Sequence, residues 1–114
     1  MISDPYLIAS ALPKELCAQA RALAYSPASY FEETGGATAI LIGKLRLSRA
    51  RSDGIASAVL RMGEAAAGLR PRRSPVRVTQ RKDGLFDVLD GNSTVVVAAA
   101  AGWRDLPCLV GQPN

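Results

Sequence analysis

The chain has 114 residues, of which 48% are hydrophobic and 21% are charged, and it contains no histidine. A chain of this length predicts one domain, in which folding buries roughly two-thirds of the surface that the unfolded chain exposes. The missing imidazole excludes a Ser-His-Asp triad, a Cys-His dyad and a two-histidine zinc site. Cys17 and Cys108 lie far apart without CxxC spacing, which argues against a zinc cluster or a disulfide framework and is typical of a reducing cytoplasm.

The N-terminal sequence MISDPYLIAS has an acid and a proline where a signal peptide would have basic residues. No apolar run approaches the length of a transmembrane helix. We therefore expect a cytoplasmic protein that has no membrane partner.

The formal net charge of +4 is distributed unevenly along the chain. Residues 1–43 carry −2, residues 44–82 carry +9 and residues 83–114 carry −3. Arginine supplies nine of the eleven basic residues of the middle segment, and its guanidinium suits bidentate recognition of phosphate or carboxylate. The segment therefore indicates an anionic partner; the alternative is a solvated face that only aids solubility.

Apolar residues at helical spacing predict a first helix over residues 13–25. Residues 26–36 read as a loop, in which Tyr30 and Phe31 anchor the chain on the core. A strand is predicted over residues 37–41. Three apolar residues in and after this strand are expected to face the core: Ile40, Ile42 and Leu45.

A basic turn follows, and Ser52 or Asp53 is placed to cap a second helix over residues 54–67. Gly68 provides a C-terminal stop, and residues 69–75, which are rich in arginine and contain two prolines, predict an exposed connection. The buried stripe of this helix is expected to consist of four residues: Ile55, Val59, Met62 and Ala66.

The strongest β-hairpin pattern of the chain comes next. Val76 and Val78 alternate with polar residues, residues 82–84 read Lys-Asp-Gly, and residues 85–89 form the second strand.

A third helix is predicted to open within residues 90–94. Its interior, residues 95–101, has no polar residue and must therefore be largely buried, and its three valines have weak helix propensity. Gly102 ends the helix, Trp103 packs back on it, and residues 107–110 form a closing strand.

The predicted order is helix, strand, helix, β-hairpin, helix and strand. This order indicates an α/β (α+β) fold, with a small mixed sheet and a central hairpin packed by about three helices. We expect an N-terminal helical extension over residues 1–36 and one compact unit over residues 37–114.

Several segments between residues 39 and 110 follow the pattern of one family. They read LRLSRAR at residues 45–51, PVRV at 75–78, DGLFDVLDGNST at 83–94 and GWRDLPCLV at 102–110. With these motifs the chain resembles the ParB/sulfiredoxin-like domain, also described as the ParB-like nuclease domain, over roughly two-thirds of its length. The resemblance implies that family's fold and an accessory role in a bacterial or phage system, such as a toxin–antitoxin or other conflict system.

The loop between the hairpin and the third helix also has a physical interpretation of its own. A strand that turns through a glycine into a helix presents free backbone N–H groups at the positive end of the helix dipole, which suits a phosphate or another anion. Four residues would supply backbone and hydroxyl donors: Gly91, Asn92, Ser93 and Thr94. Arg49 and Arg51 on the neighbouring turn would supply the counter-charge. The alternative is that Asp90, Asn92 and Ser93 only cap the helix.

The chain departs from better-known members of the family in this loop. ParB proteins that bind and hydrolyse CTP carry arginines where this chain has Ser93, Thr94 and Val96. Sulfiredoxins carry a catalytic cysteine followed by His-Arg where this chain has Asn92, Ser93 and Thr94. We therefore expect neither activity. We also expect no centromere-type recognition, because the chain has no room for the family's helix-turn-helix domain.

Three functions remain open. The first is a binding module for a nucleotide or nucleic acid, which uses the loop at residues 91–94 together with a basic surface. Four arginines are the candidates for that surface: Arg70, Arg72, Arg73 and Arg77. The second is a weak nuclease or nucleotidase, in which carboxylates hold Mg²⁺ beside the phosphate. Its candidate catalytic residues are Asp53, Asp87 and Asp90. The third is a protein-interaction module, such as an antitoxin, an inhibitor or a phage-encoded regulator, that binds an acidic protein without catalysis.

Overall fold

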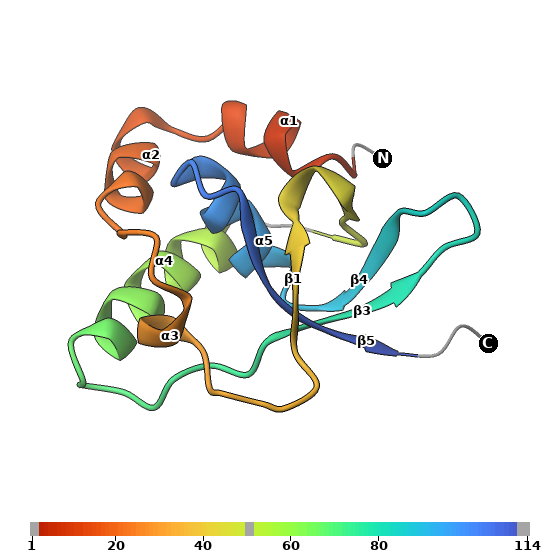
Figure 1. Ribbon diagram of the computed structural model, residues 1–114. Coiled ribbons are helices and arrows are strands. Elements are labelled where there is room, and N and C mark those ends of the chain that lie inside the picture. The colour runs from red at the N-terminus through yellow and green to blue at the C-terminus, as the bar shows by residue number, and fades with distance from the viewer. Residues whose placement is uncertain (1–2, 50–51, 112–114) are drawn as a thin grey trace.

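One mixed, curled sheet of five strands organises the computed structural model, which describes residues 3–49 and 52–111 (Figure 1). The strands are β1 (Thr38–Leu41), β2 (Leu45–Arg46), β3 (Val76–Gln80), β4 (Phe86–Asp90) and β5 (Asp105–Gly111). Their order across the sheet is β1-β5-β3-β4-β2. The β1–β5 and β3–β4 pairs are antiparallel, whereas β2–β4 and β3–β5 are parallel. The prediction of an α/β fold with a small mixed sheet built around a hairpin is confirmed.

Helices cover the sheet, and the longest of them are α2, α4 and α5. The helices are α1 (Pro5–Ser10), α2 (Lys14–Arg21), α3 (Pro27–Tyr30), α4 (Ser52–Ala66) and α5 (Asn92–Ala100), with a 3-10 turn, η1, at Ile42–Lys44. α5 packs against α1, α2 and α4 and also contacts β3 and β5, so it lies at the centre of the molecule (Figure 1). Among the described residues, no helix combines the length and the apolar character needed to cross a bilayer.

The N-terminal part differs from the single helix predicted over residues 13–25. α2 ends at Arg21, because Leu23 and Ala24 direct their carbonyl oxygens to the Trp103 Nε1 and the Tyr30 hydroxyl instead of continuing the helix. α1 was not predicted, although its start has a recognisable pattern. The Asp4 carboxylate accepts a hydrogen bond from the Tyr6 N–H, and a proline occupies the first helical position.

The predicted loop over residues 26–36 is also partly helical, because α3 occupies its first half. Tyr30 and Phe31 are buried, as predicted, and they belong to the same hydrophobic core as the sheet and α5. Ile40, Ile42 and Leu45 are buried as well, as the strand pattern predicted.

α4 begins at Ser52, so Asp53 lies in its first turn and not at its N-cap. Its buried face contains three of the four predicted residues, but Ala66 is exposed. Ala58 and Ala65 complete the buried face instead, because each lies three residues from a buried neighbour on the same side of the helix. Gly68 stops the helix as predicted, at a φ of +79°.

The hairpin and the last helix form close to their predicted bounds. The turn between β3 and β4 contains Gly84 at a φ of +87°, and the Asp83 carboxylate accepts from the Leu85 N–H. α5 is buried along its valines and ends before Gly102, which has a φ of +82°. Trp103 is buried, and its ring lies against Tyr25 and Tyr30, whereas its packing on α5 stays a prediction.

Candidate anion-binding site

The N-termini of α4 and α5 meet at a pocket of about 370 Å³, which we call the α4–α5 pocket. Its walls combine the start of both helices, the end of β4 and two arginines from separate connections. The lining residues are Arg49, Gly54, Arg73, Asp90, Gly91, Asn92, Ser93 and Thr94. The structure therefore brings Arg49 to the predicted loop at residues 91–94, whereas Arg51 lies outside the described residues. The positive ends of two helix dipoles face one cavity.

Gly91 makes the turn from β4 into α5 possible. Its φ of +105° lies in the left-handed region, and a Cβ at this position would come within 3.0 Å of the Val76 Cγ2 atom. Gly91 is the N-cap of α5 and supplies no side-chain cap. Since no described side chain bonds to the N–H groups of this first turn, the alternative in which Asp90, Asn92 and Ser93 cap the helix is wrong.

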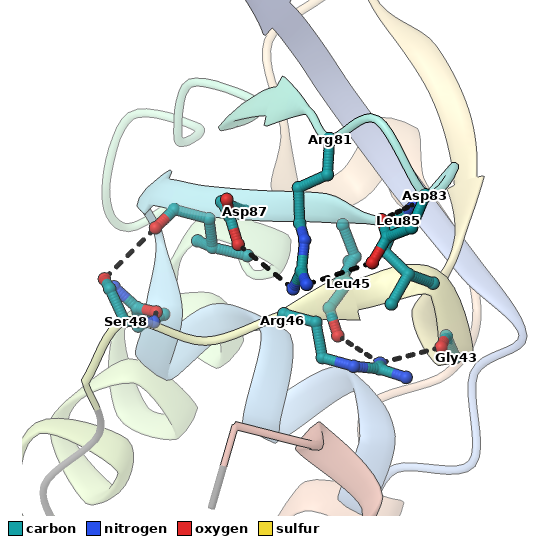
Figure 2. A network of polar contacts seen from close by, with 10 residues as sticks. Gly43, Leu45, Arg46, Ser48, Arg81, Asp83, Leu85 and Asp87 are labelled. Atoms are coloured by element: carbon teal, nitrogen blue, oxygen red, sulfur yellow. Dashed lines mark hydrogen bonds and ion pairs between the residues drawn. The ribbon is translucent and has the colours of Figure 1, made fainter. Parts of the chain in front are cut away.

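Asn92 is buried and uses its amide within the protein. Its Oδ1 accepts from the Ser48 N–H at 2.9 Å and from the Arg49 N–H at 3.5 Å, and its Nδ2 donates to the Ser48 Oγ at 3.1 Å. The Ser48 hydroxyl in turn donates to the Val88 carbonyl oxygen on β4 (Figure 2). The Asn92 side chain therefore fixes the segment that carries Arg49, while its backbone N–H takes part in none of these bonds.

Ser93 and Thr94 complete the first turn of α5 beside α4. A Cβ on Gly54 would lie 3.0 Å from the Ser93 Oγ, so this hydroxyl faces the first turn of α4. Thr94 is only 2% exposed. A glycine at position 54 leaves room for the two helix starts to approach each other.

Arg73 brings a half-buried guanidinium to the pocket. Its backbone is fixed, because its N–H donates to the Tyr30 carbonyl oxygen and its own carbonyl oxygen accepts from the Glu32 N–H. Its Nη1 atom is buried, and no described residue accepts a hydrogen bond from it. Burial, together with the charge of Arg61, lowers the pKa of Arg73, yet an arginine stays protonated at neutral pH. An unpaired buried donor of this kind costs free energy unless a ligand or water accepts from it.

Of the other three arginines of the predicted basic surface, the fold keeps Arg70 near Arg73 and separates Arg72 and Arg77 from it. Arg70 lies beside a second hollow next to the pocket and pairs with Glu64 at 3.2 Å. Arg72 donates to the Ala28 carbonyl oxygen on α3. Arg77 is exposed on β3 and, because Val76 and Val78 on either side are buried, it projects from the opposite face of the sheet.

The second hollow, which we call the arginine hollow, has a volume of about 340 Å³ and adjoins the α4–α5 pocket. Arg61 lines it together with Arg70 and Arg73. Arg61 was not among the predicted site residues, because it lies within α4 and no local pattern links it to the connection that follows.

The three candidate carboxylates do not converge. Asp90 lines both the α4–α5 pocket and the arginine hollow. Asp87 pairs with Arg81 at 3.6 Å in the hairpin, and Figure 2 shows Arg81 reaching toward Asp87 and Asp83. Asp53 accepts from the Gly54 N–H. Within residues 3–49 and 52–111, no three acidic or cysteine side chains gather in a way that could hold a metal ion, so the predicted Mg²⁺ site would retain only Asp90 at the pocket.

No protein-family model, curated protein or solved structure matches this chain. The resemblance to the ParB/sulfiredoxin-like domain therefore stays a prediction that rests on the motifs quoted for it.

Proposed function

We propose that this protein is a cytoplasmic binding module of the ParB/sulfiredoxin-like type, in a bacterial or phage system, that binds the phosphate of a nucleotide or nucleic acid. The α4–α5 pocket is the binding site. The observation that carries the proposal is the unpaired, buried Arg73 Nη1 at a pocket onto which two helix N-termini open. Backbone N–H groups at a helix start and a guanidinium are the donors that phosphate oxygens prefer.

Each part of the pocket has a separate task in this proposal. The first turn of α5 supplies N–H donors, and Arg73 neutralises the anion. From α4, Gly54 lines the pocket, but its N–H already donates to the Asp53 carboxylate. Arg49 is exposed at the pocket, where the Asn92 amide holds its backbone. Asp90 also lines the pocket, and its carboxylate would accept from a ligand hydroxyl or amino group.

Binding without turnover is the function that these residues support best. A nuclease or nucleotidase needs a metal or a general base at the phosphate, and Asp90 alone of the three candidate carboxylates lies there.

The test is a thermal-shift titration with inorganic phosphate and with nucleoside triphosphates, each with and without Mg²⁺. A ligand at about 100 times its Kd should stabilise the native protein by about 2.7 kcal/mol. Arg73→Gln should abolish the shift, whereas Arg77→Gln, on the other face of the sheet, should retain it. A flat titration for the unmodified protein, or an equal loss in both variants, would contradict the proposal.

A further inference from the structure

The arginine hollow is a second cavity with arginines in its walls, directly beside the α4–α5 pocket. The two cavities are neighbours that share a wall, to which Arg73, Asp90, Gly91 and Thr94 contribute. An anion in the α4–α5 pocket would therefore have a second cationic cavity directly beside it, on the far side of Arg73.

Three guanidinium groups approach one another at the arginine hollow. Arg61 and Arg70 both lie close enough to Arg73 for their positive charges to disfavour its own. Asp90 is the acidic residue among the lining side chains, and Glu64 pairs with Arg70 from outside the hollow. Like charges that the fold holds together favour the binding of an anion between them.

Arg70 is free to change its partner. Its ion pair with Glu64 lies at the surface, where the two side chains are 48% and 33% exposed. Exposed pairs of this type contribute little to stability, so a phosphate can replace the carboxylate at small cost.

We propose that the α4–α5 pocket and the arginine hollow bind neighbouring phosphates of one nucleic-acid strand, with Arg73 between them. This inference rests on the proposed function and specifies its ligand as a polymer backbone instead of a mononucleotide. Recognition is independent of sequence, because phosphates are the same at every base. The residues that line the two described cavities also include no aromatic side chain on which a base could stack.

The donors favour phosphate over the carboxylates of an acidic protein. Arginine pairs with both groups, but the first turn of α5 at the α4–α5 pocket adds backbone N–H donors that suit the several oxygens of a phosphate. An acidic protein is therefore the competing ligand that the test has to separate.

The test compares three probes by fluorescence anisotropy or calorimetry at low salt. They are inorganic phosphate, an oligothymidylate of about eight nucleotides, and a polyglutamate peptide of equal charge. The variants are the double substitution Arg61→Gln with Arg70→Gln, and Arg77→Gln as the matched control on the opposite face. Thermal unfolding of each variant checks that it is folded.

We expect the oligonucleotide to bind at least about tenfold more tightly than phosphate, and the double variant to lose about that factor while it still binds phosphate through the α4–α5 pocket. Arg77→Gln should leave both affinities as they are. If phosphate binds but the oligonucleotide binds no more tightly, the inference is overturned and the proposed function stands. Equal binding of polyglutamate, or an equal loss in Arg77→Gln, also overturns it. If none of the probes binds, the proposed function fails with it.

Discussion

Gly91 is the residue on which the geometry of the candidate site depends most directly. It combines a φ of +105° with a Val76 methyl group that would lie 3.0 Å from an added Cβ. Gly91→Ala should therefore destabilise the protein by about 2 kcal/mol or more, because it adds steric conflict to backbone strain. Urea unfolding measures the loss.

Gly84→Ala is the matched control for this substitution. Gly84 has a similar φ of +87°, but an added Cβ would meet nothing within 4 Å. The Gly84→Ala variant should lose only the free energy that is due to backbone strain, roughly 1 kcal/mol. Equal losses at the two positions would show that Val76 moves aside and that the close approach has no energetic weight.

Ionisation of the Cys108 thiol should make the stability of the protein depend on pH in the alkaline range. Burial raises the pKa of its thiol from 9.0 to about 12. The folded state therefore holds its proton more strongly than the unfolded state does. This contribution to stability is complete below pH 9 and is lost as the pH rises toward 12, by at most about 1.4 kcal/mol per pH unit.

Comparison with Cys108→Ala isolates this effect, because the pKa values of Tyr25 and Tyr30 are also raised and act in the same alkaline range. The variant should be less stable at pH 8, owing to the lost packing, but its stability should fall less steeply between pH 9 and 11. Parallel pH profiles, measured by urea unfolding, would rule out the thiol as the cause.

At the level of elements, α5 shows how burial overrides local propensity. Three consecutive valines disfavour a helix, yet the segment is helical and its valines are 0% exposed. The gain from packing against α1, α2, α4 and the sheet exceeds the few tenths of a kcal/mol that each valine costs in a helix.

Val97→Ala tests that balance. It should destabilise the protein by about 2 kcal/mol despite the better helix propensity of alanine, because it removes buried methyl groups and leaves a cavity. Val110→Ala on β5, where the side chain is 43% exposed, should cost less than about 1 kcal/mol. The readout is urea unfolding, and a neutral or stabilising Val97→Ala would mean that propensity outweighs packing in α5.

The sequence predicted those helices and strands whose ends are marked by turn or stop residues in the local sequence. The Lys-Asp-Gly turn specified the hairpin, and Gly68 and Gly102 marked the ends of α4 and α5. Over residues 13–36 it predicted a helix and the buried Tyr30 and Phe31, but it missed α3 and the end of α2 at Arg21, where the chain turns to reach Trp103 and Tyr30. These are contacts with residues far along the chain or across a loop, and no short pattern reveals them.

The candidate site follows the same division. The glycine turn into α5 was predictable from local sequence. Arg49 was also placed beside it correctly, although 42 positions separate it from Gly91. The side-chain amide of Asn92 reaches Ser48 across 44 positions and positions the segment with Arg49, a role that the sequence did not predict. The approach of Arg61 to Arg73 likewise depends on tertiary packing.

For the whole molecule, what matters for binding is which of the basic side chains lie together in the folded structure. The middle segment carries +9, yet Arg77 and Arg72 project away from the cavities and Arg81 is engaged by Asp83 and Asp87. Arg46 donates to the Gly43 and Leu45 carbonyl oxygens. Among the described residues, four arginines line the two cavities: Arg49, Arg61, Arg70 and Arg73. Binding should therefore reflect four charges and not the total of the segment.

The salt dependence of oligonucleotide binding measures that number. If each of the four arginines neutralises one phosphate, the logarithm of the association constant should fall with the logarithm of salt concentration at a slope of about −3 for a single strand. Arg73→Gln should reduce the slope by about 0.7, and Arg77→Gln should leave it unchanged. A slope of about −6 that both substitutions reduce equally would mean that the whole basic segment binds as a diffuse surface, and the two cavities would then have no special role.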